Sequence, residues 1–213
     1  MDIEFFGGNC FRIKTKQAVI VIDDCLAKMG KKTVANDKAV AFYTADATYD
    51  EASAKASRLV IQTPGEFEVG DVTVRGVAAR AHMDTDDQKT ATVYQFMYSG
   101  QTVSVLGHIH PDVSGDVLEL VSGSDVLIVP VGGNGFTLDP VGATQVIKKA
   151  EPAVVIPSQY HIDSFAYEVP AQTLEDFAKV ASLNLEEPVD SFKVGKSGEE
   201  GAAQTRVVVL AVK

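Results

Sequence analysis

The chain has 213 residues, of which 46% are hydrophobic, and its 19 Lys and Arg against 29 Asp and Glu give a formal net charge of −10. A chain of this length buries about 70% of its unfolded surface, so it needs neither a disulfide nor a structural metal in order to fold. Its acidic surface lacks the basic charge that neutralises phosphates, and we expect no nucleic-acid partner.

The amino-acid sequence predicts neither export nor a membrane span. The first residues lack a basic segment followed by an apolar core, and no apolar run approaches the ~18 residues of a membrane span. The two cysteines, Cys10 and Cys25, lie beside apolar runs and are too few for a disulfide scaffold. These observations predict a cytoplasmic protein without a membrane partner. They leave open a homo-oligomer and identify no ligand.

Short β-branched runs separated by Gly, Asn, Asp or Lys fill the first half of the chain. Their spacing predicts a mostly antiparallel meander with a single helix at 50–57. The expected strands are 2–6, 10–14, 18–23, 39–43, 58–62, 66–69 and 71–77.

The second half alternates strands with helices, which is typical of βαβ units. Strands are expected at 91–98, 101–106, 125–130, 152–156 and 205–212, and helices at 114–122, 139–150 and 171–182. The polar stretch 184–204 is predicted to be a surface loop. Because no linker or repeat divides the chain, we expect one domain over 1–213, built as an α/β sandwich.

The helix at 139–150 has the clearest boundaries. Asp139 can accept a hydrogen bond from a first-turn N–H, and Pro140 occupies the first helical position, where no donor is needed. Lys148 and Lys149 lie in the last turn, and Pro152 follows.

A His-x-His pair, His108 and His110, follows one of the expected strands. In an extended segment two such imidazoles share one side and could bind zinc. The remaining histidines, His82 and His161, would have to come from distant loops. The acidic string at 82–87 resembles a calcium loop, but a loop that starts at Asp84 would need a turn glycine at its sixth position, where Lys89 stands, and an acidic surface loop is favoured.

Six segments, in order, resemble those of the metallo-β-lactamase superfamily, in particular its small Zn-dependent hydrolases related to ascorbate-phosphate lactonase. Phe-Gly-Gly-Asn-Cys-Phe-Arg-Ile at 6–13 resembles the family's Leu-Gly-His-Ser-Cys-Phe-Leu-Ile, and Pro-Gly-Glu-Phe-Glu-Val at 64–69 resembles Pro-Gly-Glu-Tyr-Glu-Val. The others lie at 21–24, 105–108, 128–133 and 153–160. The resemblance implies a four-layer αββα sandwich in which 45–50, 107–110, 132–137 and 158–161 converge on one edge.

The family's metal ligands, by contrast, are replaced. At its defining His-x-His-x-Asp-His motif this chain has Ala45, Ala47, Tyr49 and Asp50. Alanine offers no donor atom to a metal, and the bulkier Tyr49 could fill the vacated volume, with Asp23, Asp50, His108 or Gln159 as a partner for its phenol.

Further replacements affect the remaining ligand positions. His108 stands for the bridging aspartate, Gln159 for the final histidine and Gly8 for a histidine beside the site, while His82 falls at or next to the third histidine. Losing these groups removes most of a metal-binding free energy on the order of 10 kcal/mol.

The sequence therefore predicts a degenerate metal site with no catalytic residue and no cofactor, in a binding or scaffold protein. The alternative is a Zn- or Mn-dependent hydrolase, of lactone or phosphoester type, rebuilt on His82, His108, His110 and His161 with Asp50 or Asp46. A metal-free enzyme is the third hypothesis.

Overall fold

Two mixed β-sheets stack face to face in the computed structural model, which describes residues 1–195 and 205–213. The first sheet has six strands in the order β12 (Phe192–Lys193), β1 (Asp2–Gly7), β2 (Cys10–Lys14), β3 (Val19–Ile22), β4 (Val40–Phe42) and β5 (Leu59–Ile61). The second has seven, in the order β13 (Arg206–Val207), β11 (Val154–Ser158), β10 (Val126–Pro130), β9 (Gln101–Val105), β8 (Ala91–Tyr98), β7 (Val72–Ala79) and β6 (Gly65–Val69).

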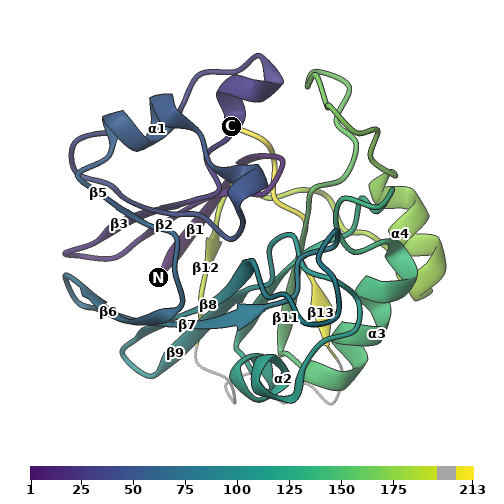
Figure 1. The fold of residues 1–213 in the computed structure, drawn as a ribbon. Helices are drawn as coiled ribbons and strands as arrows, with labels where there is room; N and C mark the ends of the chain where they lie inside the picture. Colours follow the sequence, from purple (N-terminus) through teal and green to yellow (C-terminus); the bar gives the residue numbers. More distant parts are fainter. Residues whose placement is uncertain (196–204) are drawn as a thin grey trace.

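Helices cover the outer sides of both sheets, which gives the predicted αββα order of layers (Figure 1). Helix α1 (Glu51–Ala56) lies outside the first sheet, with the 3-10 turns Leu26–Met29 and Asp46–Thr48 near it. Helices α2 (Gly115–Val121), α3 (Pro140–Ala150) and α4 (Leu174–Ala181) lie outside the second sheet. None of the helices described is long and apolar enough to cross a membrane.

Helix boundaries follow the local sequence signals. The Asp139 carboxylate accepts a hydrogen bond from the Gly142 N–H at 2.7 Å at the start of α3, as its Asp-Pro start predicts. Thr173 and Asp176 form a reciprocal capping box at the start of α4.

The core lies between the two sheets and is built by aromatic side chains from both. Phe42 of β4 contacts Tyr94 and Phe96 of β8 edge to face, with ring centroids 5.1 and 5.2 Å apart. Phe5 of β1 stacks on Phe11 of β2 at 4.8 Å. All five residues of β10 are buried because this parallel strand has neighbours on both sides and layers on both faces.

The expected antiparallel meander is wrong for part of the first half. Strands β3, β4 and β5 pair in parallel. The connections through Leu26–Met29 and through α1 act as crossovers, and a parallel pair needs such a crossover in place of a tight turn.

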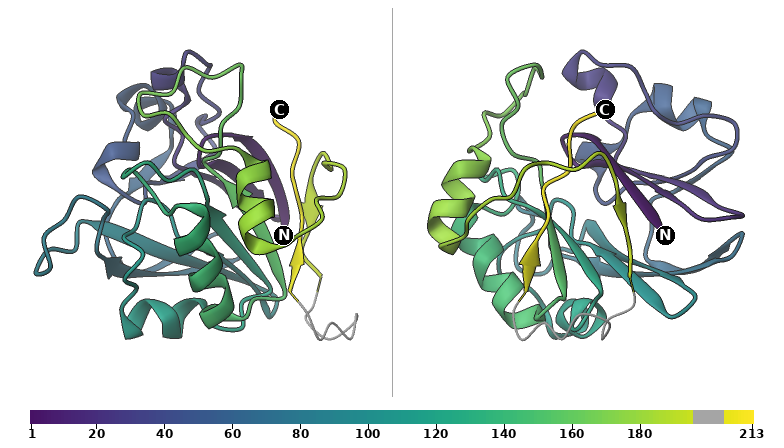
Figure 2. Two further views of the ribbon diagram at one scale, coloured as in Figure 1. Left: turned by 90° about the vertical axis from the view of Figure 1, so that its right-hand side faces the viewer. Right: turned by 180° about the vertical axis from the view of Figure 1, so that it is seen from behind.

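The C-terminal region also departs from the prediction. The stretch expected to be a loop, 184–204, contains β12, which pairs with β1 at the edge of the first sheet, and its residues 196–204 lie outside the described part. The expected strand 205–212 is regular only at Arg206–Val207, after which single bridges join Leu210 to Val189 and Val212 to Phe5. The chain end therefore lies beside β1, as the rear view in Figure 2 shows.

Candidate functional site

Loops from both sheets meet at one edge of the sandwich, as predicted from the family resemblance. Thr44 follows β4 and Gly107 follows β9, and a Cβ built on Gly107 would lie 2.3 Å from the Thr44 Cβ. The Thr137 hydroxyl donates to the Gly107 carbonyl at 3.5 Å. Gly132 lies so close to Gln159 that an added Cβ would stand 1.9 Å from the Gln159 carbonyl oxygen. The four segments that were expected to converge therefore lie next to one another, and we call this place the converging edge; the segments are 45–50, 107–110, 132–137 and 158–161.

Asp23, at the end of β3, is the centre of a buried hydrogen-bond network at this edge. Its carboxylate accepts hydrogen bonds from the Asn9 amide, the Thr44 N–H, the Thr44 hydroxyl and the Thr48 hydroxyl, all at 2.6 or 2.7 Å. Asn9 in turn accepts a bond from the Ser158 hydroxyl at 2.6 Å. Because Ser158 ends β11, this network links the two sheets.

Asp50, at the position of the family's last histidine, caps α1. One carboxylate oxygen accepts from the N–H groups of Ala52 and Ser53 at 2.9 and 3.0 Å. The neighbouring Asp24 uses Oδ2 to accept from the Ser53 hydroxyl and from three donors in the loop 33–35, while its buried Oδ1 has no partner. Both carboxylates hold loops and the helix start in place.

The other replaced positions of the motif contribute backbone and ring contacts. The Ala47 carbonyl accepts from the Lys28 ammonium at 3.1 Å, and Ala45 packs against the core. Tyr49 is half-buried, with its ring 5.2 Å from that of Tyr43. Within the part of the chain described, no hydrogen bond joins the Tyr49 phenol to the four partners suggested for it.

His108 is buried at 3% exposure, and among residues 1–195 and 205–213 neither of its ring nitrogens has a hydrogen-bond partner. Burial lowers the pKa of this imidazole, an effect that the nearby Asp23 carboxylate opposes. Its ring contacts Phe136 edge on at 4.6 Å. Both polar atoms of this ring are therefore unsatisfied within the described part of the chain.

His110 does not pair with His108 as the His-x-His spacing suggested, because the segment bends after Gly107 and is not an extended strand. Its ring lies 5.7 Å from that of His82, and its Nδ1 accepts from the Asp112 N–H at 3.0 Å. Burial, Arg80 and His82 lower the pKa of His110. His82 and His110 line two separate hollows, of about 300 and 270 Å³.

The last two predicted site residues lie apart from these histidines. His161 is exposed and pairs with Asp163, its Nε2 lying 3.0 Å from the carboxylate. Gln159 is buried with a left-handed φ of 52° and donates its N–H to the Gly8 carbonyl at 2.7 Å.

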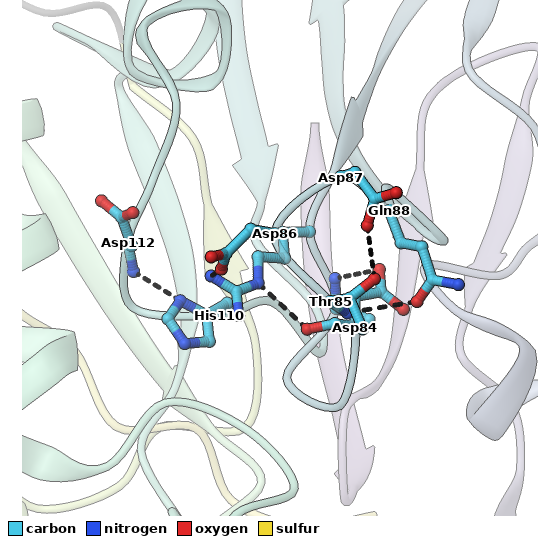
Figure 3. Close-up of polar contacts among 9 residues, drawn as sticks. Asp84, Thr85, Asp86, Asp87, Gln88, His110 and Asp112 are labelled. Atoms are coloured by element: carbon cyan, nitrogen blue, oxygen red, sulfur yellow. Dashed lines mark hydrogen bonds and ion pairs between the residues drawn. The ribbon is translucent and has the colours of Figure 1, made fainter.

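The residues at the family's His-x-His-x-Asp-His positions do not reproduce that motif's set of metal ligands. The side chains of Ala45 and Ala47 have no atom that could bind a metal ion. Oδ1 of Asp50 already accepts two N–H hydrogen bonds at the start of α1. Across 1–195 and 205–213, no three His, Cys, Asp or Glu side chains are gathered as a metal shell requires. In the acidic stretch 82–87, for which a surface loop was favoured over a calcium loop, the Asp84 carboxylate accepts hydrogen bonds from the Ala81 N–H, the Thr90 N–H and the Thr90 hydroxyl. Asp84 and its neighbours in this loop are drawn in Figure 3.

Comparison with known proteins agrees with this architecture. The sequence profile of the beta-lactamase superfamily domain matches residues 2–159, so the chain belongs to that superfamily. No curated protein matches the chain.

Solved structures of the metallo-β-lactamase superfamily share the fold. A candidate Zn-dependent hydrolase of that superfamily from Thermotoga maritima is 22% identical, with a TM-score of 0.69 over 100% of this chain and 99% of the other. The isothiocyanate hydrolase from Delia radicum gut bacteria is 12% identical, with a TM-score of 0.65 over 92% and 100%. A metallo hydrolase from Ignicoccus hospitalis is 15% identical, with a TM-score of 0.58 over 91% and 99%. Identities this low indicate the fold alone.

Proposed function

We propose that this chain is a non-catalytic binding or scaffold protein, a pseudoenzyme whose metal site has degenerated. The observation that carries the proposal is that polar side chains at the converging edge make hydrogen bonds that hold the loops and the start of α1. Asp23 is saturated by four short hydrogen bonds and Asp50 caps α1. Metal-assisted hydrolysis requires ligands that lower the pKa of a bound water, and these groups are committed to holding loops.

The hydrogen-bond network supports this proposal in a second way. In a metalloenzyme the bound ion ties together the loops that supply its ligands. Here the chain of bonds from Ser158 through Asn9 to Asp23 joins the ends of β11 and β3 without an ion. The loops are therefore ordered by side chains of the protein itself. The free thiols of Cys10 and Cys25 support a reducing, cytoplasmic location.

Metal content and stability test the proposal. Protein purified without a histidine tag should contain less than stoichiometric zinc or manganese. Its thermal midpoint should stay constant in micromolar zinc, because only an ion that binds the folded state raises stability, by RT ln(1 + [L]/Kd). A Cys25→Ser variant serves as control for zinc captured by a thiol. A midpoint that rises with zinc and no longer does so in His108→Ala would contradict the proposal.

A rebuilt metal-dependent hydrolase is the second candidate, and one observation favours it. His82 Nδ1 and both ring nitrogens of His108 are buried without a hydrogen-bond partner among the residues that the structure describes, and unpaired imidazoles are potential metal ligands. This function predicts hydrolysis of a lactone or phosphodiester that a chelator abolishes and zinc or manganese restores. It further predicts loss of that activity in His82→Ala and in His108→Ala, with Lys38→Gln, on an exposed lysine of another loop, as the control.

A further inference from the structure

A hollow of about 270 Å³ lies beside the loop that joins β7 to β8, and Ile109 and His110 of the segment 107–110 form part of its lining. We call it the Arg80 hollow. Its apolar lining includes Ala79, Ile109 and Val117, each at most 4% exposed. A cavity of this size with a rigid apolar lining suits a small organic molecule.

Hydrogen-bond donors predominate among the polar groups of the Arg80 hollow. Arg80 is held by Asp86 at 2.8 Å and by the Asp84 carbonyl at 3.2 Å, through its Nη1 and Nε atoms (Figure 3). Its Nη2 atom has no bond within the described residues. The Lys89 ammonium, which also lines the hollow, makes no ion pair within them either.

Three neutral side chains add donors to this lining. The Gln88 carbonyl oxygen accepts from the Thr85 N–H, so its amide NH₂ stays available. His110 accepts at Nδ1, so the proton of its neutral ring is on Nε2. The Ser114 hydroxyl is buried and has no hydrogen-bond partner in the described part of the chain, although Ser114 precedes α2, where such a side chain usually caps the helix.

We propose that the Arg80 hollow binds a small organic monocarboxylate, whose apolar body rests on Ala79, Ile109 and Val117. The carboxylate accepts hydrogen bonds from Lys89, Ser114 and the free edge of Arg80. An anion that carries only acceptors complements a lining rich in unsatisfied donors. Asp86 and Asp112, which also line the hollow, select against a second negative charge on the ligand.

This inference goes beyond the proposed function and does not depend on it. The Arg80 hollow contains none of the residues at 45–50 or at 159, and binding of a carboxylate there requires no metal ion. Zinc binding at the converging edge would contradict the proposed function and leave this inference standing. If no carboxylate bound, this inference would be wrong and the proposed function would still stand.

Calorimetric titration with 4-methylpentanoate tests the inference. A ligand of about eight heavy atoms should bind with a Kd near 1 mM. Lys89→Gln should weaken binding about fivefold. Ser114→Ala should weaken it to a similar extent and leave the thermal midpoint unchanged, because no cap bond is lost. Lys38→Gln, on an exposed lysine of another loop, is the matched control and should bind normally.

Two further ligands and a mapping experiment complete the test. Succinate, with its second carboxylate, and 3-methylbutylamine, with a cation on a similar body, should both bind at least about fivefold more weakly. Amide NMR shifts on titration should concentrate at 109–114. No saturation by about 10 mM, binding that survives Lys89→Gln unchanged, equal binding of succinate, or shifts centred elsewhere would each overturn the inference.

Discussion

Thr44 and Gly107 touch across the gap between the two sheets. Thr44 lies two residues after the end of β4 and donates its N–H to the Asp23 carboxylate. Gly107 turns the chain after β9 with a left-handed φ of 64°. An added Cβ at Gly107 would lie 2.3 Å from both the Cβ and Oγ1 of Thr44. The absence of a side chain at position 107 is therefore what lets the loops of both sheets close on one another.

Gly107→Ala should destabilise the protein by more than about 3 kcal/mol, because it adds a steric clash to the strain of a left-handed alanine. Gly100→Ala isolates the strain, since Gly100 has a φ of 77° and nothing lies within 4 Å of an added Cβ. That control should lose only about 1 kcal/mol. Urea unfolding measures both, and equal losses would show that Thr44 is not in contact with residue 107.

Asp50→Ala should cost about 1 kcal/mol of unfolding free energy, because it removes the acceptor at the start of α1. Asp50→Asn keeps a side-chain oxygen and should recover most of the loss. Chemical denaturation in the presence of a chelator checks this. If asparagine were as harmful as alanine, the charge of Asp50 would have a function other than capping.

Glu4 should make stability depend on pH in the acid range. Burial raises its pKa, but hydrogen bonds from Arg12, Lys213 and Lys14 outweigh this and bring the pKa down to about 2. Because the folded pKa lies below the unfolded value of about 4.3, the stabilisation is complete above pH 4.3 and is lost as the pH falls towards 2.

The Glu4→Gln variant measures this contribution. The wild type should lose up to about 3 kcal/mol between pH 4.5 and 2 that the variant does not lose. Urea unfolding at a series of pH values gives both curves. Asp37→Asn, on an exposed carboxylate, is the control and should follow the wild type. Parallel curves for Glu4→Gln and the wild type would mean that the three cations do not act on Glu4 in the folded state.

His108→Leu should change stability by no more than about 1 kcal/mol, since it removes two buried nitrogens that have no partners. Asn9→Leu is the matched control at another buried polar position. There the same replacement breaks bonds to Asp23 and Ser158 and should cost about 2–4 kcal/mol. Thermal unfolding compares the two variants. A large loss at His108 alone would indicate a partner for its ring, such as a metal ion.

The amino-acid sequence predicted most of the regular elements because their signals are local. The Asp-Pro pair at 139–140 specifies a cap and a first turn that involve only neighbouring residues, and α3 begins where expected. The direction of pairing in β3, β4 and β5 was not predicted, because it depends on where the crossovers return the chain. The two-residue β12 was missed because so short a strand is defined by its partner β1.

At the site, the residue types alone fix which chemical groups are available, since Ala45 and Ala47 offer no metal donor in any conformation. How the remaining groups are used depends on the folded arrangement of the chain. It gave Asp23 four donors from separate segments, brought His110 beside His82, and buried His108 against Phe136. Side-chain identity is fixed by the covalent chain, whereas hydrogen bonding and burial depend on residues that are distant along the chain and adjacent only after folding.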